Sequence, residues 1–262
     1  MTGSANRGGV ARLWLLNFFG NAAALAAWYF WLLVPDAHGW QVALSLVAAV
    51  AIVLLVAWLR AGTFAYFRRT EFRERGEVWL SFRHAVRHIY VLVLWAIALA
   101  AVLLFLFRLR VYSPQFGVWL WQKLPESLRV TSPRGMAQGA DGLLWLLFFV
   151  VAPGFWLPVA TSIAAAGWRA RVLHSLRATR HVTYWVWFFL LIAVCVYLPY
   201  RLIWWIPDLD TLRKQAWSMG LRFFAAYVLL ITAWIALVWM VGVRTEREVG
   251  DRITVGAGHN GV

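Results

Sequence analysis

The stretch IYVLVLWAIALAAVLLFLF, residues 89–107, decides the fold of this chain. It holds no charged residue, and His88 and Arg108 stand directly before and after it. Because a helix rises about 1.5 Å per residue, about 20 apolar residues cross the roughly 30 Å hydrocarbon core of a bilayer. The stretch therefore predicts a transmembrane helix with a polar group at each end.

Five other stretches have a similar length and apolar character. They cover residues 13–34, 41–59, 142–164, 182–203 and 223–243. The chain as a whole is 63% hydrophobic and 14% charged, whereas soluble domains are about 45–50% apolar and about 25% charged. We expect an all-α fold, a polytopic transmembrane helix bundle of about six spans that forms a single membrane domain over residues 1–262.

The basic residues predict the orientation of this bundle. Lys and Arg number 25, and 16 of them fall on the side that holds both termini and the segments 60–88 and 165–181. Since basic residues concentrate in cytoplasmic loops, we expect both termini inside, in a bacterial cytoplasmic (inner) membrane. No stretch of sequence remains for a soluble nucleic-acid module, so the net charge of +14 indicates anionic lipid headgroups on the inner face as partners.

Three segments outside the spans have a predicted structure. Segment 68–87 predicts a cytoplasmic amphipathic helix, because Glu71 and Arg75 have the i, i+4 spacing of a helical ion pair. Segment 116–128 mixes Trp and Leu with charged residues and predicts a short outer helix that lies in the interface. Residues 244–262 form a polar C-terminal tail, which we expect to be disordered from residue 256 on.

The third and fifth spans align without a gap at an offset of 93 residues, which indicates parallel internal repeats. Eight of thirty positions are identical: Ala85/Ala178, Arg87/Arg180, His88/His181, Val93/Val186, Ala100/Ala193, Arg108/Arg201, Leu109/Leu202 and Pro114/Pro207. Two spans that cross the same bilayer thickness can have polar residues at the same spacing without common ancestry. A true repeat and such a coincidence therefore both stay open as interpretations. Either way, Arg87, Arg108, Arg180 and Arg201 are expected to contact lipid headgroups at the two surfaces.

Ionisable residues deep in a span mark functional sites by default. No Asp, Glu, Lys or Arg falls centrally in the six predicted spans, since Arg60 follows the second span. This pattern argues against a proton-coupled transporter and a voltage sensor. Asn17 and Asn21, one helical turn apart, are expected to hydrogen-bond to a neighbouring helix, with a ligand contact as the alternative.

His88 and His181 are the candidate haem ligands. They are expected at equal depth on two helices, and imidazoles that face each other could ligate haem iron. However, arginines flank both histidines, and no carboxylate is placed to orient the rings. We therefore favour interfacial histidines in a basic collar and predict neither a cofactor nor a metal.

Two prolines five residues apart, Pro153 and Pro158, predict a kink or break in the fourth span. Transporters place substrate sites at such breaks, where freed carbonyls face a cavity. Gly154, Thr161 and Ser162 complete this candidate substrate site with the two prolines. Proline is also tolerated in spans when neighbours satisfy the backbone, so a kink without a ligand is the simpler interpretation.

No catalytic signature supports an enzyme. The chain has no GxSxG elbow and no HExxH motif, and its single cysteine, Cys195, excludes a CxxC pair. We expect a non-enzymatic integral membrane component that acts through contacts with lipids or other membrane proteins. The alternatives are a carrier of a neutral or amphipathic substrate near the fourth-span break and, more remotely, a haem-binding redox protein.

Overall fold

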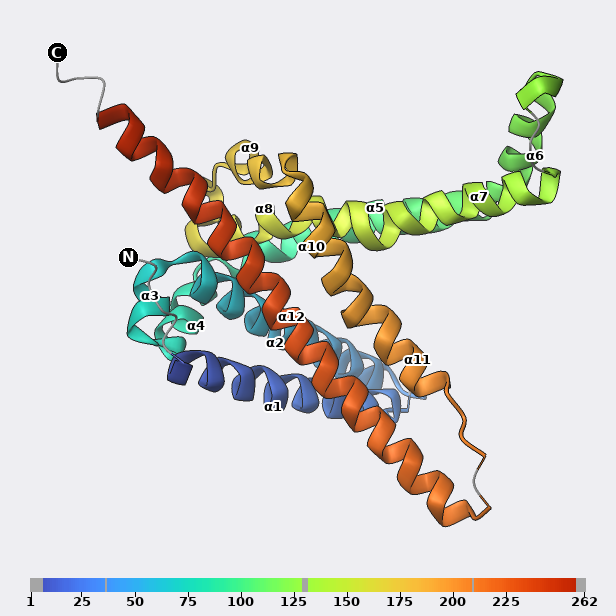
Figure 1. The fold of residues 1–262 in the computed structure, drawn as a ribbon. Helices are drawn as coiled ribbons and strands as arrows, with labels where there is room; N and C mark the ends of the chain where they lie inside the picture. Colours follow the sequence, from blue (N-terminus) through green and yellow to red (C-terminus); the bar gives the residue numbers. More distant parts are fainter. Residues whose placement is uncertain (1–6, 36, 129–131, 209, 258–262) are drawn as a thin grey trace. The chain divides into compact units, whose positions relative to one another are not determined.

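A computed structural model gives the structure of residues 7–35, 37–128, 132–208 and 210–257. These residues form helices joined by short turns and contain no strand (Figure 1). Six helical segments are long and apolar enough to cross a membrane: α1 (Arg7–Leu32), α2 (Gly39–Arg68), α5 (Ile89–Arg110), the segment Pro133–Arg169, the segment Val182–Trp204 and the Leu212–Gly242 part of α12 (Leu212–Ala257). The predicted all-α fold with six candidate spans is confirmed, and the chain is a multi-pass membrane protein.

The chain divides into two compact units. The first consists of Met1–Val93 and Pro158–Val262, and the second of Leu94–Leu157. Their boundaries fall inside α5 and inside α8 (Ala152–Ala166), so two membrane helices run from one unit into the other.

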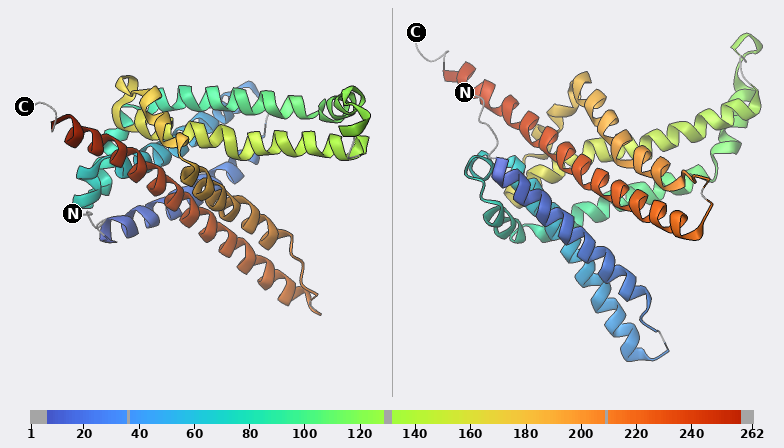
Figure 2. Two further views of the ribbon diagram at one scale, coloured as in Figure 1. Left: turned by 45° about the horizontal axis from the view of Figure 1, so that its top comes forward. Right: turned by 60° about the horizontal axis from the view of Figure 1, so that its bottom comes forward.

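The first unit is built from two helical hairpins. One joins α1 to α2, and the other joins α10 (Val182–Ile192) and α11 (Leu198–Trp204) to α12. The hairpins pack together near the ends where both chain termini lie and diverge toward their turns (Figure 2). The largest fully buried side chains come from α1, α2, α4 (Val78–Val86), α5, α8, α10 and α12: Leu13, Leu59, Phe64, Tyr66, Phe67, Phe82, Val91, Ile163, Tyr184, Phe188, Ile231 and Val238.

Helix α2 runs nine residues past the predicted end of the second span, to Arg68. Residues 61–67 are buried against α4 and neighbouring helices, and this packing keeps the backbone helical beyond Leu59. Gly62 lies against the ring of Phe82, and the Ser81 hydroxyl donates to the Gly62 carbonyl at 3.3 Å. Arg60, predicted to begin a loop, therefore lies inside a helix.

The segment predicted as one helix over 68–87 is two short helices. Helix α3 (Thr70–Arg75) ends at Gly76, which has the left-handed backbone angles φ 67° and ψ 25°, and α4 begins at Val78. The predicted Glu71–Arg75 ion pair is present at 3.8 Å. The amphipathic pattern fits each of the two short helices. Gly76 between them lacks a Cβ, so it favours a turn at this point.

The outer helix and the tail also differ from the prediction. Helix α6 (Ser113–Lys123) starts three residues earlier than the predicted segment 116–128, with Pro114 in its first turn. Residues Glu126–Leu128 form a separate 3-10 turn, η1. The predicted tail 244–262 continues α12 as far as Ala257, and residues 258–262 lie outside the described part of the chain.

The fourth span is not broken between Ala152 and Pro158. A π-helical turn, η2 (Leu147–Val151), joins α7 (Pro133–Leu146) to α8, and Pro158 lies within α8. The Ala152 N–H donates to the Leu147 carbonyl, five residues back, directly before Pro153. The missing N–H of Pro153 is therefore accommodated by a wider turn that precedes the prolines.

The fifth span also has a π-helical turn before a proline, which the sequence does not predict. A π-helical turn, η5 (Ala193–Tyr197), joins α10 to α11, and the Leu198 N–H donates to the Ala193 carbonyl directly before Pro199. Helices α5 and α10 both begin one residue after a histidine, at Ile89 and Val182, as the proposed repeat requires. However, α5 has no π turn at the corresponding positions, so the repeat stays a prediction.

Candidate functional site

A cavity of about 280 Å³ in the first unit is lined by basic residues. Its lining consists of Arg68, Ser162, Ala165, Ala166, Arg169, Ala170, Arg171 and His174. Arg68 ends α2, Arg169 belongs to the 3-10 turn η3 (Gly167–Arg169), and Arg171 precedes α9 (Val172–Ser175), which contains His174. Three elements thus bring three guanidinium groups and one imidazole around one cavity. The lining includes no carboxylate. We call it the basic cavity.

The end of α8 holds this cavity in place. The Ala165 carbonyl accepts hydrogen bonds from Arg69 Nη2 at 3.1 Å and from His84 Nε2 at 3.2 Å. The last carbonyls of a helix have no partner within the helix, so basic side chains that donate to them are favourable. Gly167, with φ +59°, then turns the chain away from the helix axis and toward Arg169.

His88 packs beside this helix end. Its ring lies 5.3 Å from the ring of His84 at an interplanar angle of 71°, and it leaves no room for a side chain at Gly167. Burial lowers the pKa of His88 below its ordinary value, and the positive charge of His84, Arg69 and Arg87 lowers it further. The neutral imidazole is therefore favoured at this position.

The structure assigns the two candidate haem ligands different surroundings. His88 is in contact with His84, whereas His181 is exposed and precedes α10 as its N-cap residue. In the described part of the chain, no group of three or more His, Cys, Asp or Glu side chains is placed to hold a metal ion. The haem alternative gains no support from this arrangement.

A buried polar network joins α1, α2 and α12. Asn17 Nδ2 donates to the Thr63 hydroxyl at 3.0 Å, so the predicted hydrogen bond between Asn17 and a neighbouring helix is confirmed. Asn21 Nδ2 donates to the Asn17 carbonyl, and Arg60 Nη2 donates to Asn21 Oδ1 at 3.0 Å. The Arg60 guanidinium lies over the indole ring of Trp234, 4.6 Å from its centroid.

Arg60 corrects the expectation that the spans hold no interior charge. It lies eight residues before the end of α2, in the middle of the contact with α1 and α12. A hydrogen bond to Asn21 and the π face of Trp234 offset part of the cost of placing a guanidinium there. The span prediction missed Arg60 because it ended the helix where the apolar run ended.

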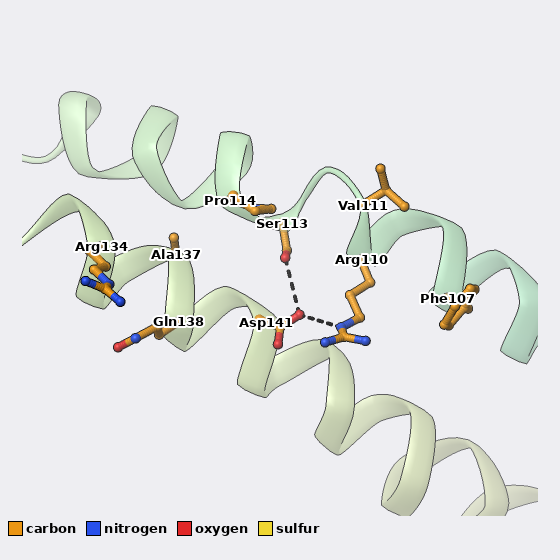
Figure 3. Close-up of a pocket in the computed structure, with 9 residues that line it drawn as sticks. All are labelled: Phe107, Arg110, Val111, Ser113, Pro114, Arg134, Ala137, Gln138 and Asp141. Atoms are coloured by element: carbon orange, nitrogen blue, oxygen red, sulfur yellow. Dashed lines mark hydrogen bonds and ion pairs between the residues drawn. The ribbon is translucent and has the colours of Figure 1, made fainter.

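The second unit contains a larger cavity, of about 560 Å³, at the turn between α5 and α7 (Figure 3). Three of its polar residues pair with one another: Asp141 accepts hydrogen bonds from Arg110 Nε at 2.8 Å and from the Ser113 hydroxyl at 3.4 Å. The Arg110 guanidinium also lies 4.4 Å from the centroid of the Trp145 ring. These contacts tie α5, α6 and α7 together, and we assign this cluster a structural role.

The predicted fourth-span site is divided between different surroundings. Thr161 is fully buried, and its hydroxyl donates to the Pro158 carbonyl at 2.8 Å. Pro158 and Gly154 are buried, and Pro153 is half-buried. Ser162 lines the basic cavity.

The four predicted headgroup arginines, Arg87, Arg108, Arg180 and Arg201, are all exposed. The cavity arginines Arg68, Arg169 and Arg171 were recognised in the sequence only as part of a diffuse basic collar. Seven of the eight lining residues lie between Ser162 and His174, but nothing local in the sequence shows that this segment folds against Arg68 at the end of α2. Comparisons with protein-family models, with curated proteins and with solved structures find no match to this chain.

Proposed function

We propose that this protein is a non-enzymatic integral membrane protein that binds anionic lipid headgroups in the basic cavity. The observation that carries the proposal is the lining: three arginines and a histidine around about 280 Å³, with no carboxylate among the lining residues. The hydroxyl of Ser162 adds a neutral hydrogen-bonding group to the same cavity.

The chemistry of the lining fits a lipid phosphate. Guanidinium groups bind phosphate oxygens through paired N–H donors, and these charge-assisted hydrogen bonds are stronger than neutral ones. The cavity lies where α2 and α8 end, which is the depth at which a spanning helix meets headgroups. A basic residue near an anionic membrane surface contributes about 1 kcal/mol to binding.

Native mass spectrometry of the detergent-solubilised protein tests the proposal. We would compare wild type with the double variant R169Q/R171Q after incubation with phosphatidylglycerol or with phosphatidylcholine. Wild type should retain phosphatidylglycerol in preference to phosphatidylcholine. Loss of two contacts of about 1 kcal/mol each should weaken phosphatidylglycerol binding about 30-fold and leave phosphatidylcholine binding unchanged.

A matched control removes two charges outside the cavity. Arg75 and Arg83 are exposed and near the same end of the first unit, so R75Q/R83Q makes the same change in net charge. This control should keep the preference for phosphatidylglycerol. Equal loss in the two double variants would show that net charge, not the basic cavity, governs lipid binding, and would overturn the proposal.

A further inference from the structure

Two buried hydrogen-bond donors in the first unit have no partner among the described residues. They are Nη1 of Arg60 and Nε1 of Trp234, and the two residues are in direct contact, with the guanidinium over the indole ring. An unsatisfied buried donor costs about 1–3 kcal/mol, more when it is charged, and lipid offers no water to satisfy it. Both groups are donors, so only an acceptor can satisfy them.

The described helices that pack around Arg60 also provide no carboxylate as a counterion for its charge. Helices α1 and α2 contain no Asp or Glu, and neither do residues 182–204 or the Leu212–Gly242 part of α12. Arg60 Nη2 is already held by the neutral amide of Asn21. The required acceptor is therefore best supplied by an anion.

Arg60 lies at a boundary along α2. The exposed fraction of the side chain is 57% at Val53 and 45% at Leu54, before Arg60, and 0% at Phe64, after it.

The Arg60 layer, which consists of Asn21, Arg60 and Trp234, therefore borders a part of α2 whose apolar side chains are exposed. A ligand that reaches Arg60 from this side passes Val53 and Leu54, so it must carry an apolar chain.

We propose that the Arg60 layer binds the acid group of an amphiphile whose hydrocarbon chain lies against the exposed apolar part of α2. A carboxylate or phosphate oxygen accepts hydrogen bonds from Arg60 Nη1 and Trp234 Nε1, and the negative charge pairs with the guanidinium. The site is separate from the basic cavity and does not depend on headgroup binding there. A fatty acid and an acidic phospholipid offer the same chemistry.

Photo-crosslinking in phosphatidylcholine nanodiscs tests the site. Three probes carry a diazirine at the same chain position: a fatty acid, a phosphatidic acid and the fatty alcohol that matches the fatty acid. Peptides from α1, α2 and α12 should be labelled at least tenfold more by an acid probe than by the alcohol. Labelling by the fatty acid alone, by phosphatidic acid alone or by both identifies the source of the acid group.

Variants separate binding from folding. R60Q removes the charge and should reduce acid labelling about tenfold, whereas R60K keeps the charge and should retain part of it. W234F removes one donor and should cause a smaller loss. W239F, at an exposed tryptophan on the same helix, should leave labelling unchanged.

Equal labelling by the acids and the alcohol would overturn the proposal. It would mean that water accepts the hydrogen bonds of Arg60 Nη1 and Trp234 Nε1. If R60Q fails to fold, two other measurements test acid binding: the labelling of W234F, and the labelling of wild type in competition with unlabelled fatty acid. Undiminished labelling in W234F, together with no competition, would also overturn it.

Discussion

Single residues without a Cβ determine how closely the helices of the first unit approach. A Cβ at Gly62 would lie within 2.6 Å of Cδ2 of Phe82, and Phe82 is fully buried. Helix α4 can pack on α2 only because position 62 has no side chain. The hydrogen bond from Ser81 to the Gly62 carbonyl depends on the same approach.

We predict that Gly62→Ala destabilises the protein by about 1–3 kcal/mol, the usual cost of overpacking a filled core. Thermal unfolding in detergent, followed by circular dichroism, should show a lower midpoint. Gly220→Ala is the control, since no atom lies within 4 Å of a Cβ at Gly220 and the helix propensity of alanine is higher. A midpoint for Gly62→Ala equal to that of wild type would mean that α4 does not pack on Gly62.

The position of Arg60 inside a helix could not be predicted from the sequence. A span is recognised by a local run of apolar residues, and that signal correctly located all six spans. The point at which a helix ends after its apolar run depends on tertiary packing. Residues 61–67 stay helical because they are buried against other helices, so Arg60 lies inside α2. No local pattern distinguishes this case from a loop.

At the level of elements, two prolines in the spans, Pro153 and Pro199, are preceded by π-helical turns. Pro153 follows η2 and Pro199 follows η5, each at the same distance, and in both turns the closing N–H bonds five residues back. The sequence predicted a kink or break at the prolines, whereas the structure has a π-helical turn directly before them and a continuous helix through Pro158. The irregularity lies on their N-terminal side because a proline removes the donor for the carbonyl four residues earlier.

We predict that Pro153→Ala restores a donor for the Phe149 carbonyl and allows the turn to tighten. A hydrogen bond of about 1 kcal/mol should slow local amide exchange about fivefold. Hydrogen–deuterium exchange mass spectrometry of peptides covering residues 147–156 measures this change. Pro158→Ala, which lies within α8 and lacks a preceding π turn, should leave exchange at residues 147–152 unchanged. Unaltered exchange in Pro153→Ala would mean that packing, and not the proline, sets the π turn.

At the level of the whole molecule, the spans and the charges together predict the topology. Six candidate spans place both termini on one side of the membrane. The basic cavity and the His84–His88 pair lie on connections between spans on that same side of the predicted topology, and the first turns of α7, which carry Gln138, lie on the other. Since 16 of the 25 Lys and Arg fall on the side of the termini, we predict that this side is cytoplasmic.

Cysteine labelling in intact cells measures the orientation. Gln138 is exposed at the rim of the cavity in the second unit, so Gln138→Cys in a Cys195→Ser background should react with a membrane-impermeant maleimide from outside. Arg75→Cys, on the exposed surface of α3, should react only after the membrane is opened. The reverse pattern would place the basic cavity outside the cell. It would contradict the rule that basic loops stay on the cytoplasmic side, and the proposed headgroup would then have to come from the outer leaflet.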